Sequence, residues 1–182
     1  LKGAGDPTLS AQPTRAETFY TQAPRIADLA AQIKRSGVEV TSVAVDTSAY
    51  PGPTMERTWD NRDIAGGDIA PIESLMVDGA RTDPLNEFSP RSATPARTAG
   101  QALADALGVG GTVITTTAGP NDRVIASVTS APLVTRVDDM MRYSDNVLAE
   151  TLSLELSVAD GGPATIAGGV AAVEKSLRAH GF

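Results

Sequence analysis

The last third of the chain carries apolar residues at helical spacing on both sides of the tripeptide Ser144-Asp145-Asn146. They fall at i, i+4, i+7 and i+8 before the tripeptide and at i, i+7 and i+11 after it: Leu133, Val137, Met140 and Met141, then Val147, Leu154 and Val158. Such intervals place residues on one face of an α-helix. Ser, Asp and Asn side chains bond to nearby backbone groups and favour turns and N-caps. The pattern predicts two helices that meet at a junction, with Asp145 or Asn146 as the cap of the second.

A third helix is predicted beyond this pair. Asp160-Gly161-Gly162-Pro163 breaks the second helix, and apolar residues then recur at helical spacing at Ile166, Val170, Val173 and Leu177. His180, the only histidine, follows at the C-terminal end, where a cation stabilises the helix dipole. We interpret His180 as a capping residue rather than a catalytic base.

The N-terminal half reads as a β-α-β unit. Residues 1–10 contain a turn at Asp6-Pro7, and a helix is predicted from the i, i+3, i+4, i+7 pattern of Ile26, Leu29, Ala30 and Ile33. Gly37 ends that helix, and the β-branched run 38–46 follows as a strand. A strand, an amphipathic helix and a second strand favour a sheet with a helix packed on it.

Residues 47–95 are interrupted by Pro and Gly and predict a small, loop-rich β subdomain. Its best strand candidate is 72–78, and its acidic residues lack the spacing of a calcium loop. A helix is predicted over 95–107, ended by Gly108. Two β-branched runs, 112–117 and 123–129, predict a hairpin around a Gly-Pro-Asn-Asp connection.

Composition narrows the function classes. The 182 residues carry a formal net charge of −7, and twelve of the fifteen basic residues are Arg without a basic run. Because a phosphate backbone rewards clustered Lys and Arg, we expect no nucleic-acid partner. The absence of Cys excludes disulfides and Cys nucleophiles. No apolar run approaches the ~20 residues of a membrane span. The chain begins at Leu1, without a signal peptide and inside an apparent strand, so we expect a piece of a longer precursor.

Three segments taken in order resemble one family. They are GAGDPTLS (residues 3–10), ASVTSAPL (126–133) and MMRYSDNVLAETL (140–152). Together they resemble the peptidase family S13 D-alanyl-D-alanine carboxypeptidases, the class C low-molecular-mass penicillin-binding proteins. The resemblance covers most of the chain and is most specific at 128–152. It implies a serine-type peptidase of the cell envelope that trims peptidoglycan stem peptides ending in D-Ala-D-Ala, reacts with β-lactams and needs no cofactor or metal.

The resemblance assigns roles to two residues only. Penicillin-recognising enzymes share a Ser-x-x-Lys nucleophile, a Ser-x-Asn motif and a Lys-Thr-Gly strand, and Ser144 and Asn146 match the second motif. This implies that Ser144 relays a proton to the leaving-group nitrogen. It also implies that Asn146 binds an amide of the substrate and helps to position the lysine of the first motif. A hydroxyl can both donate and accept, and a side-chain amide can pair with both sides of a peptide bond. Asp145 would point away from the substrate and tie the junction together.

The other two motifs are absent. No serine has a lysine three residues on, and Lys175-Ser176-Leu177 lacks the glycine of a Lys-Thr-Gly strand. The resemblance therefore implies an internal portion of such an enzyme, with a mixed α/β fold. Residues 1–129 would form a β-α-β insertion that includes the loop-rich subdomain at about 47–95. Residues 130–182 would be a helical segment of a penicillin-binding, β-lactamase-like transpeptidase domain, packed on the rest of that domain.

Two alternatives remain open from the residues alone. One is a non-catalytic envelope module that binds peptidoglycan or a partner, with Ser144-Asp145-Asn146 serving only as a helix cap. The other is a fragment of an α/β hydrolase, which the absence of a G-x-S-x-G motif disfavours.

The missing nucleophile gives a direct prediction. The polypeptide of residues 1–182 alone should not be acylated by a labelled β-lactam, because neither a Ser-x-x-Lys nor a Lys-Thr-Gly is present. Stoichiometric labelling, measured by gel fluorescence or intact mass, would contradict this expectation.

Overall fold

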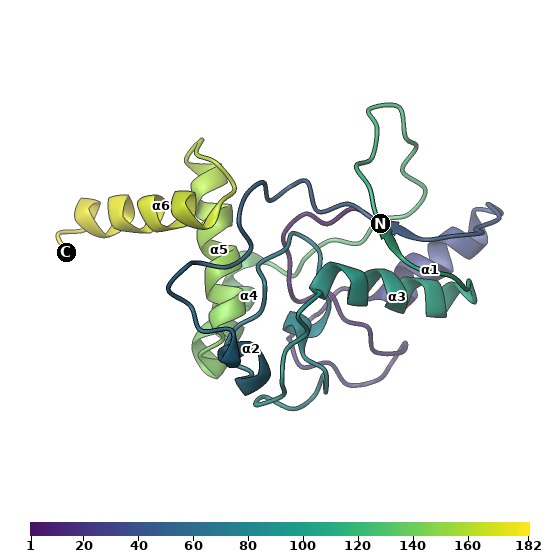
Figure 1. Ribbon diagram of the computed structural model, residues 1–182, viewed down its shortest axis with the longest axis horizontal. Coiled ribbons are helices and arrows are strands. Elements are labelled where there is room, and N and C mark those ends of the chain that lie inside the picture. The colour runs from purple at the N-terminus through teal and green to yellow at the C-terminus, as the bar shows by residue number, and fades with distance from the viewer.

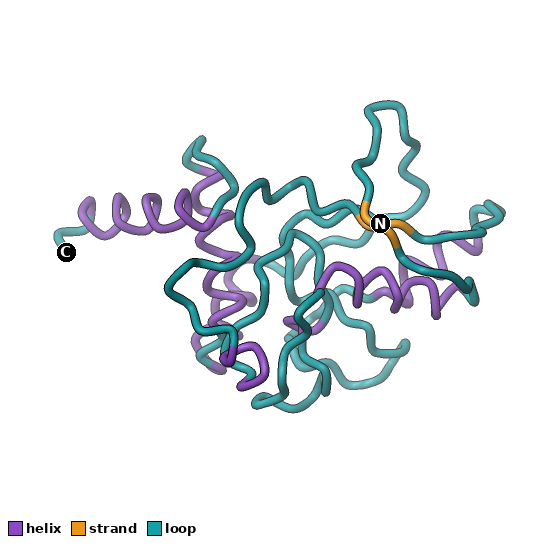
Figure 2. Tube along the Cα trace, in the orientation of Figure 1, coloured by secondary structure: helices purple, strands orange, loops and turns teal.

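The computed structural model describes residues 1–182 as a mixed, helix-rich fold with one small parallel sheet (Figures 1 and 2). Its elements are α1 (Ile26–Arg35), β1 (Ala44–Val45), α2 (Arg62–Gly66), the 3-10 helix η1 (Asp78–Ala80), α3 (Pro95–Leu107), β2 (Ile114–Thr115), α4 (Leu133–Tyr143), α5 (Asn146–Ala159) and α6 (Ile166–Ala179). No helix is long and apolar enough to cross a bilayer. In Figure 1, α1 and α3 lie at one end of the molecule and α5 and α6 at the other, with long irregular connections between them.

The predicted mixed α/β character is confirmed, with a sheet of only two short strands. Strands β1 and β2 pair in parallel, with Ala44 opposite Ile114, and Lys2 forms a parallel bridge to Asp46. The strand predicted over 38–46 was too long, because only its last residues enter the ladder. Val38 and its neighbours are exposed or half-buried and have no cross-strand partner. A β-branched run is realised as a strand only where partner strands and burial support it.

Helices α1 and α3 pack on this sheet and form the first core. The predicted face of α1 is buried, and it meets Ala99 and Leu103 of α3 and Val45 of β1. Helix α3 has Pro95 in its first turn and ends at Gly108, which adopts φ 76°. A proline in the first turn and a left-handed glycine at the end are local signals of helix initiation and termination. The helix predicted over 95–107 is therefore confirmed with both of its ends.

The predicted hairpin was wrong. Strand β2 pairs with β1, and residues 123–129 form no ladder. Ile125, Ala126 and Val128 instead pack against the first core. The side chain of Gln32 on α1 also bonds to both backbone groups of Ser127, at 2.8 and 3.1 Å. The segment therefore satisfies its polar and apolar groups on α1 rather than on a neighbouring strand.

The strand predicted at 72–78 was also wrong, although the run is buried. It is irregular and lies between two cores: Leu75 and Val77 belong to the first, whereas Ile72 and Met76 belong to the second. The consecutive apolar residues Leu75, Met76 and Val77 are divided between the two cores and form no ladder. The β character expected for 47–95 is limited to one antiparallel bridge between Arg81 and Arg91.

The three C-terminal helices are confirmed, but their apolar spacing does not mark only buried faces. The second core includes Val147 and Leu154 of α5 and Ile166 of α6. Many of the other apolar residues on these helices are exposed: Leu133, Val134, Val137 and Met141 on α4, Val158 on α5, and Val170, Val173 and Leu177 on α6. The spacing predicts helices correctly because it is local, but it does not say what the apolar faces contact.

A close approach of α3 to the sheet gives a stability prediction. A Cβ at Gly100 would lie 2.6 Å from methyl groups of both Val45 and Val113. Gly100→Ala should therefore lower the free energy of unfolding by about 1–3 kcal/mol through overpacking, although Ala favours helices. Gly110→Ala, which meets nothing within 4 Å, is the matched control and should be neutral or slightly stabilising. Chemical denaturation measures both, and equal effects would contradict the close packing.

Candidate active site

The predicted helix-helix junction is present at Ser144-Asp145-Asn146. Helix α4 ends at Ser144, which adopts the left-handed conformation with φ 50° and ψ 41°. Asp145 is the N-cap of α5, and its Oδ1 accepts a hydrogen bond from the Leu148 amide at 3.1 Å. Ser144 and Asn146 are exposed, whereas Asp145 is buried. The junction thus separates a structural residue in the middle from two polar side chains that face solvent.

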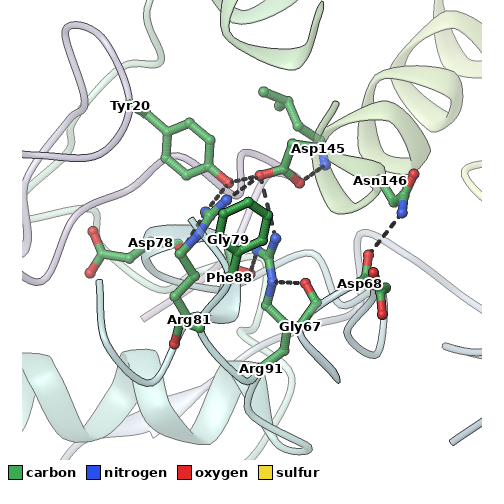
Figure 3. A network of polar contacts seen from close by, with 12 residues as sticks. Tyr20, Gly67, Asp68, Asp78, Gly79, Arg81, Phe88, Arg91, Asp145 and Asn146 are labelled. Atoms are coloured by element: carbon green, nitrogen blue, oxygen red, sulfur yellow. Dashed lines mark hydrogen bonds and ion pairs between the residues drawn. The ribbon is translucent and has the colours of Figure 1, made fainter. Parts of the chain in front are cut away.

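Asp145 lies at the centre of a buried polar network (Figure 3). Its Oδ2 accepts hydrogen bonds from the Tyr20 hydroxyl at 2.7 Å and from an Arg81 NH₂ group at 2.8 Å. Arg91 approaches the same oxygen at 3.6 Å. Arg81 also donates to the Tyr20 hydroxyl at 2.8 Å. Tyr20, Arg81 and Arg91 are themselves buried, with at most 6% of any of them exposed. Removing one member would leave another polar group buried without a partner.

Opposing effects set the pKa values in this network. Burial by itself would raise the pKa of Asp145, but attraction to Arg91 and Arg81 and hydrogen bonds from Tyr20 and Arg81 outweigh it, so the pKa lies below its ordinary value. Burial, and then the negative charge of Asp145, raise the pKa of Tyr20, against the opposing charges of Arg81 and Arg91. At neutral pH the carboxylate is ionised and the phenol keeps its proton.

Arg81 is linked to both chain neighbours of Ser144, directly to Asp145 and through Phe19 to Tyr143. It bonds directly to Asp145, and its guanidinium carbon lies 3.7 Å from the centre of the Phe19 ring. The Phe19 ring in turn packs on Tyr143, with ring centres 4.5 Å apart. A cation over an aromatic face is attracted by the ring quadrupole. Ser144 is therefore held on each side by groups that converge on one arginine.

Asn146 is positioned by the loop that precedes the second core. Its Nδ2 donates to the Asp68 carbonyl at 3.1 Å. The preceding carbonyl, that of Gly67, accepts from Arg91 Nε at 2.9 Å. Because one N–H of the Asn146 amide is used in this way, its Oδ1 and the second N–H stay available for a ligand. The Ser144 hydroxyl forms no hydrogen bond within the chain, so it too can donate and accept.

An open depression adjoins the junction. It has a volume of about 600 Å³, and Phe19, Tyr20 and Tyr143 contribute to its wall together with polar side chains that include Glu17 and Glu87. A larger and mainly apolar cavity of about 920 Å³ lies against α1 and the 118–128 segment, and neither Ser144 nor Asn146 lines it. Neither residue lines the smaller depression either, which reaches the junction only at Tyr143, the residue before Ser144.

Two further sequence interpretations, the cap at His180 and the turn at Asp6, have structural counterparts. His180 caps α6, with its Nδ1 2.8 Å from the Ser176 carbonyl, and takes no part in the junction. No group of His, Cys, Asp or Glu side chains is arranged to hold a metal ion. The segment around Asp6 forms a turn, in which Asp6 Oδ1 accepts from the Thr8 amide at 2.8 Å.

Sequence reasoning did not identify Tyr20, Arg81 or Arg91. The expectation that Asp145 ties the junction together is confirmed, and a buried carboxylate requires cationic partners. Which of the twelve arginines would supply them could not be found, because no local spacing relates Arg81 or Arg91 to Asp145.

The network makes folding depend on pH in a defined way. Asp145→Asn leaves two buried arginines facing no carboxylate and should cost about 3–5 kcal/mol of unfolding free energy at neutral pH. The pKa of Asp145 is depressed on folding, and the unfolded value is about 3.9. The unfolded chain therefore takes up the proton first, so this contribution is complete above about pH 5 and is lost as the pH falls through the folded pKa.

Urea denaturation of the wild type and Asp145→Asn between pH 3 and 7 measures this difference. Asp138→Asn is the control, because its ion pair with Arg142 lies on the exposed face of α4, where such pairs contribute little. A difference that persists unchanged at pH 3 would contradict the assignment.

Comparisons with known proteins identify the family of the chain. The chain matches the family described as D-Ala-D-Ala carboxypeptidase 3 (S13) over residues 1–89 and 81–182. It is 50% identical over 184 residues to carboxypeptidase DacB of Mycolicibacterium smegmatis, covering 100% of this chain and 40% of that protein. It is also 50% identical over 178 residues to carboxypeptidase Rv3627c of Mycobacterium tuberculosis, covering 97% of this chain and 39% of that protein. The chain thus spans about two fifths of the length of these relatives, and it belongs to the S13 family of D-Ala-D-Ala carboxypeptidases.

Proposed function

We propose that this chain is the part of a serine-type D-Ala-D-Ala carboxypeptidase that carries the Ser-x-Asn motif, at Ser144 and Asn146. One observation carries the proposal: these two side chains are exposed on a junction whose middle residue, Asp145, is buried and bonded in the interior. A turn between packed helices is a rigid mount for groups that must be held within a fraction of an ångström. Family membership supplies the reaction class.

The reaction would be acyl transfer to an activated serine, followed by hydrolysis of the acyl-enzyme. The nucleophilic serine, its lysine and the Lys-Thr-Gly strand would come from parts of the protein outside residues 1–182. Ser144 would pass a proton between that lysine and the nitrogen of the leaving D-Ala, since its hydroxyl is unengaged. Asn146 would use its free Oδ1 and N–H on the substrate amide, while its other N–H stays bonded to the Asp68 carbonyl.

The exposed apolar faces support a larger peptidase domain. Leu133, Val137 and Met141 form a stripe of exposed apolar residues along α4, directly before the motif. Contiguous exposed apolar surface of this kind marks an interface. We assign residues 130–182 to a penicillin-binding domain whose remainder covers this stripe, and residues 1–129 to an insertion in it. The substrate would be a peptidoglycan stem peptide ending in D-Ala-D-Ala, which places the enzyme outside the cytoplasm, and β-lactams would acylate it.

The proposal predicts separate effects on chemistry and on stability. In the full-length protein, Ser144→Ala and Asn146→Ala should slow D-Ala release and acylation by a fluorescent penicillin by about 10²-fold or more, as expected when a proton-transfer group is lost. Thermal stability should change little, because the side chain that caps α5 is that of Asp145. Ser127→Ala, an exposed serine beside α1, is the matched control and should match wild type in both assays.

A glycine variant sharpens the same test. Ser144 pays the steric cost of a left-handed backbone at φ 50°, which glycine avoids. Ser144→Gly should therefore raise the unfolding free energy by about 1 kcal/mol while reducing acylation as much as Ser144→Ala. If the tripeptide were only a cap in a non-catalytic module, the three variants would leave acylation of the full-length protein unchanged.

A further inference from the structure

The groups that hold Asp145 come from a distant part of the chain. Tyr20, Arg81 and Arg91 all lie within residues 1–129, whereas Asp145 lies in the helical region. We propose that Tyr20, Arg81 and Arg91 form a clamp through which the inserted region positions Ser144 and Asn146 for acylation. The clamp residues are positioning residues that act through Asp145. The inference rests on the proposed function and extends it, because it makes the insertion part of the catalytic apparatus.

The conformation of Ser144 requires such a clamp. A serine has no intrinsic preference for φ 50°, and a strained residue persists only where its surroundings over-determine it. Tyr143 is fixed through Phe19, and Asp145 is fixed through Tyr20 and Arg81. Because both flanking residues are held, the backbone between them cannot relax, and the position from which the Ser144 side chain projects is set by Arg81 and its partners.

Asn146 is coupled to the same clamp through the backbone of the 67–68 loop. Arg91 and Asn146 bond to the consecutive carbonyls of Gly67 and Asp68. A Cβ at Gly67 would lie 2.6 Å from the Ser89 carbonyl oxygen, and Gly67 has φ 91°. The loop is therefore seated tightly, and Arg91 ties Asp145 to the carbonyl that precedes the partner of Asn146.

A second strained element, the turn at residues 78–80, contacts the clamp residues Arg91 and Tyr20. Asp78, Gly79 and Ala80 have φ of 51°, 61° and 63°, so three successive residues are left-handed. Such runs are disfavoured for L-residues. The turn directs the Gly79 carbonyl at Arg91, and a Cβ at Gly79 would lie 2.2 Å from the Tyr20 hydroxyl oxygen. Backbone strain thus occurs on both sides of the clamp, at the turn and at Ser144, as is typical of sites whose geometry is functionally constrained.

The test uses Tyr20→Phe in the full-length protein. This variant keeps the ring but removes the hydroxyl that bonds to both Asp145 and Arg81. The matched control is Tyr50→Phe, which removes a tyrosine hydroxyl bonded at 3.3 Å to the Gly5 carbonyl. Acylation by a fluorescent penicillin, kcat and KM for D-Ala release, and amide hydrogen exchange of residues 140–150 are measured well below each melting temperature.

We expect Tyr20→Phe to lower the acylation rate and kcat by about 10- to 100-fold, the range produced by small misplacements of catalytic groups. KM should change by less than about threefold, and exchange of residues 140–150 should accelerate. Tyr50→Phe should leave acylation and kcat at wild-type values. Arg81→Lys keeps the charge but loses the planar guanidinium over Phe19. It should therefore also be acylated more slowly than the wild type.

The outcomes separate the clamp from the proposed function. Wild-type acylation by Tyr20→Phe, or equal losses in Tyr20→Phe and Tyr50→Phe, would overturn the clamp and leave the proposed carboxypeptidase intact. A wild-type full-length protein that neither reacts with penicillin nor releases D-Ala would overturn the proposed function and the clamp with it. Slowed acylation confined to Tyr20→Phe and Arg81→Lys would support the clamp.

Discussion

The ionised carboxylate of Asp145 is the group on which the rest of the structure depends. A buried charge is tolerated only when it is paired and hydrogen-bonded, and this one has two arginines, a tyrosine hydroxyl and a backbone amide. Those partners bring residues separated by 125 and 64 positions from Asp145 into one network. The carboxylate therefore determines how the irregular N-terminal region packs against the start of α5.

The irregular segment 69–81 makes that packing possible. It is buried on two sides, contributing Leu75 to the core of α1 and α3 and Met76 to the core beneath α5. Its end forms the left-handed turn at 78–80 and delivers Arg81 to Asp145. A segment without regular secondary structure can hold this position because its polar backbone groups are satisfied individually, as where the Asp78 amide donates to the Leu9 carbonyl at 2.7 Å.

The structural and chemical roles of the tripeptide are compatible. As an N-cap, Asp145 satisfies the Leu148 amide at the start of α5, and as an ion-pair partner it anchors the junction. Neither task uses the side chains of its neighbours, which leaves the Ser144 hydroxyl and part of the Asn146 amide free. A helix cap was the simplest interpretation of these three residues, and the structure assigns the cap to the one residue that the Ser-x-Asn motif leaves undefined. This division is what the proposed proton relay and substrate contact require.

Sequence alone determined the five long helices, the glycines that end α1 and α3, the junction, and the family resemblance that the comparisons confirm. The short helix α2 was not predicted. Helix periodicity and capping involve residues within about four positions of each other, so they can be read locally. Only tertiary structure decided the pairing of β2 with β1, the irregular course of 72–78 and the partners of Asp145. Strand pairing and buried ion pairs depend on residues brought together across the chain, and β-branched runs or scattered arginines do not specify which partner they will meet.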